Sequence, residues 1–263
     1  MLRHPMLSRR PLLTSALAAL PGLARAQAPA VPPAAPLVVC AVPGLHPGLR
    51  LLEPLWRAQG GRPLRLQAGT SAALARQVEQ GGGCDLLALA DPQRMEALEG
   101  RRLLRPESRR DLLGNDLVLA SAADQPPPRR MVLAAQLPQL LGAGKLALPD
   151  PAQTAAGRVA QEALANLGVW EALQPRLLPA AEGVAALDLV RQGQARFALA
   201  YATDLFEQPG LRLAFTFPGE SHAPITYPFA LPRRGDAAAA ELLEFLAGAD
   251  AAALWRRLGF APR

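Results

Sequence analysis

Residues 64–91 read LRLQAGTSAALARQVEQGGGCDLLALAD, and this stretch decides the fold class. Leu64 and Leu66 indicate a short strand, the small residues of Gly69–Ala72 a tight turn, and Leu74–Gln80 a helix. The apolar run Asp85–Ala90 then indicates a further strand. Strand–turn–helix units of this kind are typical of α/β folds, in which helices flank a sheet.

The turn before this helix predicts an anion site. The first N–H groups of a helix lack partners within it and point, with the positive end of its dipole, towards one place. Ser71 can add a hydroxyl donor, and the nearest cations in the sequence are Arg65 and Arg76, so neutral donors would hold the anion. The alternative is that Thr70 or Ser71 only caps the helix.

A second unit of this kind begins at residue 145. The sequence predicts a strand over Lys145–Leu148, a turn of small residues over Pro149–Gly157, and an amphipathic helix after it. This turn is a second candidate anion site. The expected role of Asp150 is to fix the turn through its own backbone.

Three other positions have predicted structural roles. The continuous apolar run Leu37–Val42 is typical of a central parallel strand covered on both faces. Pro54, inside the helix that follows, is expected to kink it or to restart it one turn later. Asp91 precedes Pro92 and is expected to cap a helix that begins with that proline.

The amino terminus has the pattern of an export signal over residues 1–26. Arg3, Arg9 and Arg10 precede an apolar run from Leu12 to Leu23, and small residues around Ala26 suit a cleavage site. The Ser8–Leu13 segment resembles a twin-arginine signal, and the general secretory route stays open. The apolar run is about 12 residues long, whereas a membrane span needs roughly 20.

Charge gives no support for nucleic-acid binding. The whole chain carries a formal +6, but residues 1–26 hold four arginines and no acidic residue, which leaves about +2 on the exported part. No Lys/Arg run is interleaved with aromatic residues. About 237 residues remain after processing, enough for one large domain or two modest lobes, and residues 27–36 are expected to be a Pro/Ala-rich tether.

Cys40 and Cys84 are the two cysteines of the chain. An even pair in an oxidising compartment permits a disulfide, but nothing in the sequence fixes the distance between the two residues. Buried free thiols are the commoner outcome at strand positions, and we expect them here. The spacing matches no metal motif.

Five segments of the chain resemble, in order, periplasmic molybdate-binding proteins of ABC importers: residues 69–91, 112–120, 149–157, 197–204 and 216–228. The resemblance implies an α/β type II periplasmic binding protein with two lobes, each a mostly parallel sheet flanked by helices, and two crossing strands as the hinge. Its implied divisions are a first lobe over 37–115, a second lobe over 116–219, and a return crossing with C-terminal first-lobe helices over 220–263.

The resemblance also implies the ligand contacts. It assigns them to the Ser71 hydroxyl, the backbone amide of Ala156, an amide at the start of the helix after residue 182, and the Tyr201 hydroxyl. Ungapped counting gives the third contact to Gly183, and matching residue type gives it to Val184. Without the resemblance, Tyr201 would be interpreted as a half-buried core residue at a strand end.

Gly44 departs from the family pattern. The ungapped alignment from Leu37 to Leu45 places Gly44 where these proteins have a serine that contacts the oxyanion. The Gly44 amide is then the remaining contact at this position.

The implied function is capture of molybdate or tungstate in the periplasm and delivery to the permease and ATPase subunits of an ABC importer. The protein is expected to be a monomer with no metal cation, no cofactor and no nucleic-acid partner. A site made only of donors would also reject hydrogen phosphate, whose proton needs an acceptor. The alternative is a binding protein of the same fold for another oxyanion, such as sulfate, or for a small carboxylate.

The sequence lacks the residues that two other classes of function require. An enzyme would need a nucleophile, an acid/base pair or a cofactor, and the scattered His4, His46 and His222 supply none of these. His222, in the return crossing, is expected to be a structural hinge residue. A transcriptional effector domain would need a DNA-binding module before residue 37, where the export signal stands instead.

Overall fold

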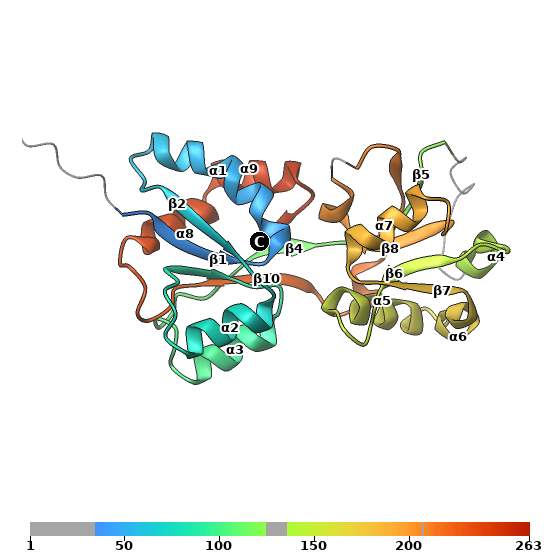
Figure 1. Cartoon of the computed structure of the whole chain (residues 1–263), viewed down its shortest axis with the longest axis horizontal. Helices are drawn as coiled ribbons and strands as arrows, with labels where there is room; N and C mark the ends of the chain where they lie inside the picture. The colour runs from blue at the N-terminus through green and yellow to red at the C-terminus, as the bar shows by residue number, and fades with distance from the viewer. Residues whose placement is uncertain (1–34, 125–135, 207) are drawn as a thin grey trace, which may run out of the picture. The chain divides into compact units, whose positions relative to one another are not determined.

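The structure is a computed structural model that describes residues 35–124, 136–206 and 208–263. The predicted export signal, most of the tether and most of the proline-rich segment at 123–130 lie outside the described residues. Within the described part, the strands form two sheets, each with its own helices (Figure 1).

The first sheet has the strand order β11-β4-β10-β3-β1-β2. Its parallel strands are β1 (Leu37–Ala41), β2 (Leu64–Ala68) and β3 (Leu86–Ala88). Antiparallel to these or to one another run β10 (Ile225–Ala230), β4 (Arg110–Asn115) and β11 (Ala261–Pro262). The central place of β1, between β3 and β2, is the one predicted from its apolar run.

Helices cover both faces of this sheet because the strand side chains are apolar on both sides (Figure 1). Val38 and Cys40 pack in the same cluster as α2 (Ser71–Glu79) and α3 (Pro92–Gly100). Leu37 and Val39 belong to the larger cluster with α1 (His46–Ala58), α8 (Ala239–Ala247) and α9 (Ala249–Arg257). The alternation follows from the two-residue period of a strand.

The second sheet has the order β7-β6-β8-β5-β9. Its parallel strands are β6 (Leu146–Pro149), β7 (Leu177–Ala180) and β8 (Phe197–Tyr201), and β5 (Leu117–Ala122) and β9 (Leu211–Thr216) add antiparallel pairings. One face packs on α7 (Gly183–Arg191); the other packs on α4 (Leu137–Leu141), α5 (Ala155–Asn166) and α6 (Trp170–Leu173). Both sheets are therefore mixed, with parallel strands beside the predicted ligand turns.

Two crossings join the sheets. The first is the step from β4, which ends at Asn115, to β5, which begins at Leu117. The second leads from β9 through a 3₁₀ turn, η5 (Gly219–Ser221), to β10. Asn166 of α5 donates to the Ser221 carbonyl at 3.0 Å, which fastens this crossing to the second sheet. In the same segment His222 is buried and its Nδ1 lies 2.8 Å from the Ala223 carbonyl oxygen, a structural position as predicted.

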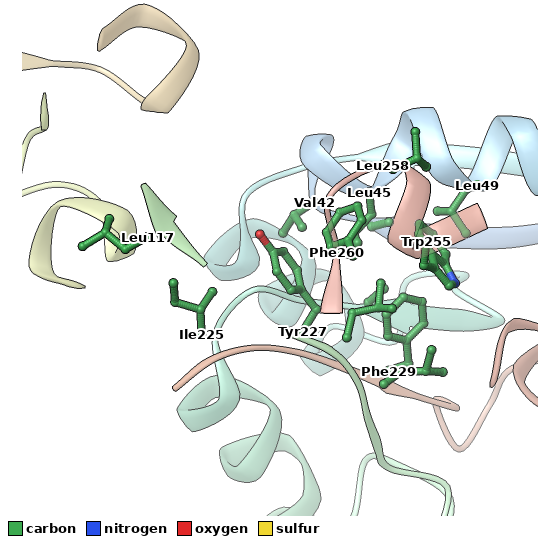
Figure 2. Close-up of a cluster of buried hydrophobic side chains, with 14 of the residues drawn as sticks. Val42, Leu45, Leu49, Leu117, Ile225, Tyr227, Phe229, Trp255, Leu258 and Phe260 are labelled. Atoms are coloured by element: carbon green, nitrogen blue, oxygen red, sulfur yellow. The ribbon is translucent and has the colours of Figure 1, made fainter. Parts of the chain in front are cut away.

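The C-terminal segment returns to the first sheet, as the sequence predicts. Phe260 packs edge-on against both Trp255 and Tyr227, with ring centroids 5.3 Å apart in each pair (Figure 2). Burial of such large aromatic side chains is among the strongest contributions to a core. This cluster also contains Leu45, the residue after Gly44, so it packs against the turn at the end of β1.

The prediction of free thiols is wrong: Cys40 and Cys84 form a disulfide, with Cα atoms 5.8 Å apart. The separation suits a bridge because the loop after α2 folds back onto the sheet, where Asp85 N–H donates to the Val38 carbonyl at 2.8 Å. That hydrogen bond holds Cys84 beside β1. No free cysteine is present in the described residues.

Of the two outcomes expected for Pro54, the restart of the first helix one turn later is wrong, whereas the kink stays a prediction. α1 runs without a break from His46 to Ala58 and includes Pro54. The proline is exposed, so the carbonyl that loses its helical partner is on the solvent side of the helix. Water can replace the missing donor there, which lets the helix continue.

Candidate functional site

The predicted contacts of the first sheet lie at the carboxyl ends of its parallel strands. β1 runs into the 3₁₀ turn η1 (Pro43–Leu45), which contains Gly44, and β2 runs into α2, which begins at Ser71. Helix starts at this edge of a parallel sheet are where ligands of open α/β folds bind. Gly44 and Ser71 follow neighbouring strands, since Ala41 pairs with Ala68.

The start of α2 has the donors that the sequence predicts. Thr70 caps the helix, its Oγ1 accepting from Ala73 N–H at 3.2 Å. Ser71 Oγ instead accepts the N–H of Ala90, after β3, at 3.1 Å. The Ser71 oxygen is thus held in place by a main-chain donor while its own proton has no acceptor in the described residues, and the amides of Ser71 and Ala72 are unpaired there too.

The start of α5 repeats this arrangement on the second sheet. Thr154 is the cap, with Oγ1 accepting from Gly157 N–H at 2.9 Å, and Asp150 Oδ1 accepts from Ala152 N–H at 2.9 Å as the predicted Asx turn requires. Ala155 and Ala156 N–H keep no partner among the described residues. A side chain at Gly157 would collide with the backbone of Pro149 and Asp150, so this tight turn needs glycine.

The start of α7 is the least capped of the three helices. Its N-cap is Glu182, whose side chain makes no capping hydrogen bond, and the first-turn amides of Gly183, Val184 and Ala185 are unpaired in the described residues. Val184 is 38 % exposed, whereas Gly183 is buried. Both alternatives for the third contact therefore belong to one set of unsatisfied donors, and the register between them stays a prediction.

Tyr201 ends β8, beside the starts of α5 and α7. Burial is the largest reason that the pKa of its hydroxyl is raised, followed by the neighbouring Tyr227 and Asp204, while Arg158 of α5 acts in the opposite direction. The phenol therefore stays protonated. Its hydroxyl donates no hydrogen bond within the described part of the chain. It is therefore a neutral donor that can bond to a ligand.

A cavity of about 570 Å³ lies between helices and turns that follow strands of the two sheets, in the part of the chain that the structure describes. Among its lining residues are Gly44 from the first sheet and Val184 from the second, together with Arg50, Glu182 and Asp204. Ser71, Ala156, Gly183 and Tyr201 are not in this lining; they lie at the same carboxyl edges of their sheets. Of the predicted contacts, Gly44 and Val184 therefore line the same cavity.

Asp204 lines the cavity and was not predicted from the sequence. It lies in the 3₁₀ turn η4 (Ala202–Leu205), and its Oδ2 accepts the N–H of Tyr201 at 3.0 Å. A Cβ at Gly183 would collide with the same oxygen, so only glycine leaves room for the carboxylate. The cavity lining itself is not made only of donors, because it includes the carboxylates of Asp204 and Glu182. That the anion is held by donors alone stays a prediction.

A second feature absent from the sequence analysis is a polar network at the first crossing. Asn115 Nδ2 donates to Thr203 Oγ1 at 2.8 Å and to the Tyr227 hydroxyl at 3.0 Å. Thr203 lines the cavity, so this network ties the crossing strands to the cavity wall. Residues this far apart in sequence offered no local pattern that could reveal the pairing.

Two other kinds of site are absent from the described residues. No group of three or more His, Cys, Asp or Glu side chains there is arranged to hold a metal ion. The same part of the chain contains no helix with the length and apolar character needed to cross a bilayer.

Comparison with known proteins identifies the family. The family model described as bacterial extracellular solute-binding protein matches residues 37–261. The chain belongs to this family. Over 193 residues it is also 34 % identical to the molybdate-binding protein ModA of Escherichia coli (strain K12), an alignment that covers 73 % of this chain and 75 % of ModA.

Solved structures confirm the two-lobe fold class predicted for the chain. The substrate-binding domain of a putative molybdenum ABC transporter from Clostridium difficile has a TM-score of 0.77 at 27 % identity, covering 85 % of this chain and 97 % of that one. The periplasmic molybdate-binding protein of Azotobacter vinelandii has a TM-score of 0.70 at 20 % identity, covering 86 % and 98 %. The resemblance seen in the sequence is thereby confirmed.

Proposed function

We propose that this solute-binding protein captures molybdate or tungstate in the periplasm and delivers it to the permease of an ABC importer. One observation carries the proposal: three helices begin with unpaired amides at the carboxyl edges of two sheets, in a chain 34 % identical to a molybdate-binding protein. Such helix starts bind anions through backbone N–H groups and the helix dipole.

The division of the donors between the sheets supports a capture mechanism. Gly44 and Ser71 lie at the carboxyl edge of the first sheet, whereas Ala156, the α7 amides and Tyr201 lie at the carboxyl edge of the second. An anion that contacts both sets is bound more tightly when the two approach, so ligand binding favours a closed conformation. A permease that recognises the closed conformation would accept loaded protein only. Monomeric action and partnership with an ATPase subunit are further parts of this proposal.

The disulfide supports an extracytoplasmic location. Bridges such as Cys40–Cys84 persist in oxidising compartments, which include the bacterial periplasm, and are rare in the cytosol. This agrees with the export signal predicted from the first 26 residues.

The test is a calorimetric and thermal-shift screen of the purified chain, treated with a chelator, against molybdate, tungstate, sulfate, phosphate and small carboxylates. We expect one site that binds molybdate or tungstate with no added cation or cofactor. Phosphate must be included in the screen because Asp204 could accept the proton of hydrogen phosphate. Heat and stabilisation with sulfate or a carboxylate, but with neither molybdate nor tungstate, would contradict the substrate assignment and leave the fold unaffected.

Gly44→Ser is expected to tighten molybdate binding. A Cβ at Gly44 would meet no atom within 4 Å and Gly44 has no positive φ, so a serine fits without strain. Its hydroxyl would restore a donor at the cavity, worth roughly 1–3 kcal/mol if an anion oxygen is otherwise unpaired and little if water already fills the place.

Dissociation constants of the two forms decide this prediction, and Gly44→Ala is the matched control, because alanine adds the Cβ without the hydroxyl. A serine variant that folds normally and binds molybdate no better than the alanine variant would show that the register is wrong or that the pocket is shaped for another ligand.

A further inference from the structure

Asp204 is a carboxylate placed among the donors of an anion site. It lines the cavity that Gly44 and Val184 share, and its Oδ2 is engaged by the Tyr201 amide at 3.0 Å. The same carboxylate lies against the first residue of α7, Gly183, where only the lack of a side chain makes room for it. It therefore lies between two of the predicted anion contacts, Tyr201 and the start of α7.

The charged and polar groups near Asp204 come from four elements. Burial raises the pKa of Asp204 to about 6, the Tyr201 N–H opposes the rise, and Glu182 at the start of α7 adds to it. Tyr227 of β10 also faces this carboxyl, and Asp204 in turn raises the pKa of the Tyr227 hydroxyl. Arg50 of α1 lines the same cavity and is the cation among its lining residues.

We propose that Asp204 couples oxyanion binding to the uptake of one proton, and so determines which charge states of the ligand the cavity accepts. This inference rests on the proposed function. An ionised carboxylate at this place repels a dianion, and like charges close together shift the equilibrium towards the protonated form. The proton comes from solvent and is expected on Oδ1, since Oδ2 accepts from Tyr201. The resulting O–H adds a donor and removes a negative charge.

The coupling of molybdate binding to the protonation of Asp204 fixes how affinity changes with pH. The free protein holds Asp204 ionised above pH 6, and the complex with a dianion holds it protonated to a higher pH. Binding therefore takes up a proton in that range, and affinity must fall as the pH rises, by at most about tenfold for each pH unit. Below pH 6 the carboxyl is already protonated in the free protein, and the dependence should level off.

The experiment is titration calorimetry of the purified wild-type chain with sodium molybdate between about pH 6 and pH 8.5, in pairs of buffers that differ in ionisation enthalpy. We expect wild-type protein to take up close to one proton per molybdate near pH 7.5. Asp204→Asn keeps an oxygen for the Tyr201 N–H but cannot be ionised. It should take up no proton, show a flat pH profile, and bind roughly tenfold to a hundredfold more tightly than wild type near pH 8.

Glu182→Gln is the matched control. Glu182 is an exposed carboxylate in the same lining, so a general effect of negative charge would be removed by this change as well. We expect proton uptake and the slope of the pH profile to persist in this variant, with the onset of the slope moved to lower pH because Glu182 no longer helps to raise the pKa of Asp204. Equal flattening in both variants would overturn the assignment to Asp204.

Three other results would overturn the inference. Wild-type protein that binds molybdate without proton uptake near pH 7.5 excludes the coupling whether or not Asp204→Asn folds, while leaving the proposed function intact. A folded Asp204→Asn protein that keeps the wild-type slope assigns the proton to another group. Wild-type protein that binds neither molybdate nor tungstate at any of these pH values overturns the proposed function and this inference together.

Discussion

Removal of the Cys40–Cys84 disulfide is expected to lower the free energy of unfolding by about 4 kcal/mol. The bridge spans 44 residues of sequence, and closing a loop of that size restricts the unfolded chain by about this amount. In a domain of this size such a loss corresponds to a fall in Tm of roughly 8–16 °C. Denaturant unfolding of the oxidised chain, with and without a reductant, measures it.

The Cys40→Ala/Cys84→Ala double variant is the control, because alanine places no hydroxyl in a buried position. Its stability should match that of the reduced wild-type chain, apart from a small cavity term, and should not respond to reductant. Affinity for the anion should change little, since neither cysteine lies in the cavity lining. Equal stability of oxidised and reduced wild type, with free thiols verified by mass, would contradict the prediction.

The disulfide illustrates what a sequence without an alignment leaves open. Local patterns correctly predicted Asp91 as a cap and offered Thr70 as one, because a cap bonds to an amide two or three residues away. They could not predict the approach of Cys84 to β1, which depends on how the loop after α2 folds back. The same limit applies to Ser71, whose hydroxyl accepts from Ala90, a residue that follows a different strand.

The candidate site was predictable where it depends on main-chain donors. Small residues between a strand and a helix indicate unpaired amides, and the structure has them at α2, α5 and α7. Asp204 was not predicted, because a carboxylate after a strand end more often faces solvent. The one available signal was its position three residues after Tyr201, where it can accept the N–H of that residue.

Tyr201→Phe is expected to weaken molybdate binding by about one to two orders of magnitude. The change removes one donor to a charged acceptor, which is worth about 1.5–3 kcal/mol. Because burial keeps the phenol protonated, the loss should be the same at every pH at which the wild-type protein binds. Calorimetric dissociation constants of the two proteins give the result directly.

Stability separates this role from a packing role. The Tyr201 hydroxyl donates to no described residue, so Tyr201→Phe should leave the free energy of unfolding of the ligand-free protein nearly unchanged. Tyr227→Phe is the contrasting variant, since the Tyr227 hydroxyl accepts from Asn115 at 3.0 Å in a buried position. Its loss should cost stability, of the order of 1 kcal/mol, with little effect on affinity. A Tyr201→Phe protein with wild-type affinity would make Tyr201 a core residue, and the second sheet would then hold the anion by backbone amides alone.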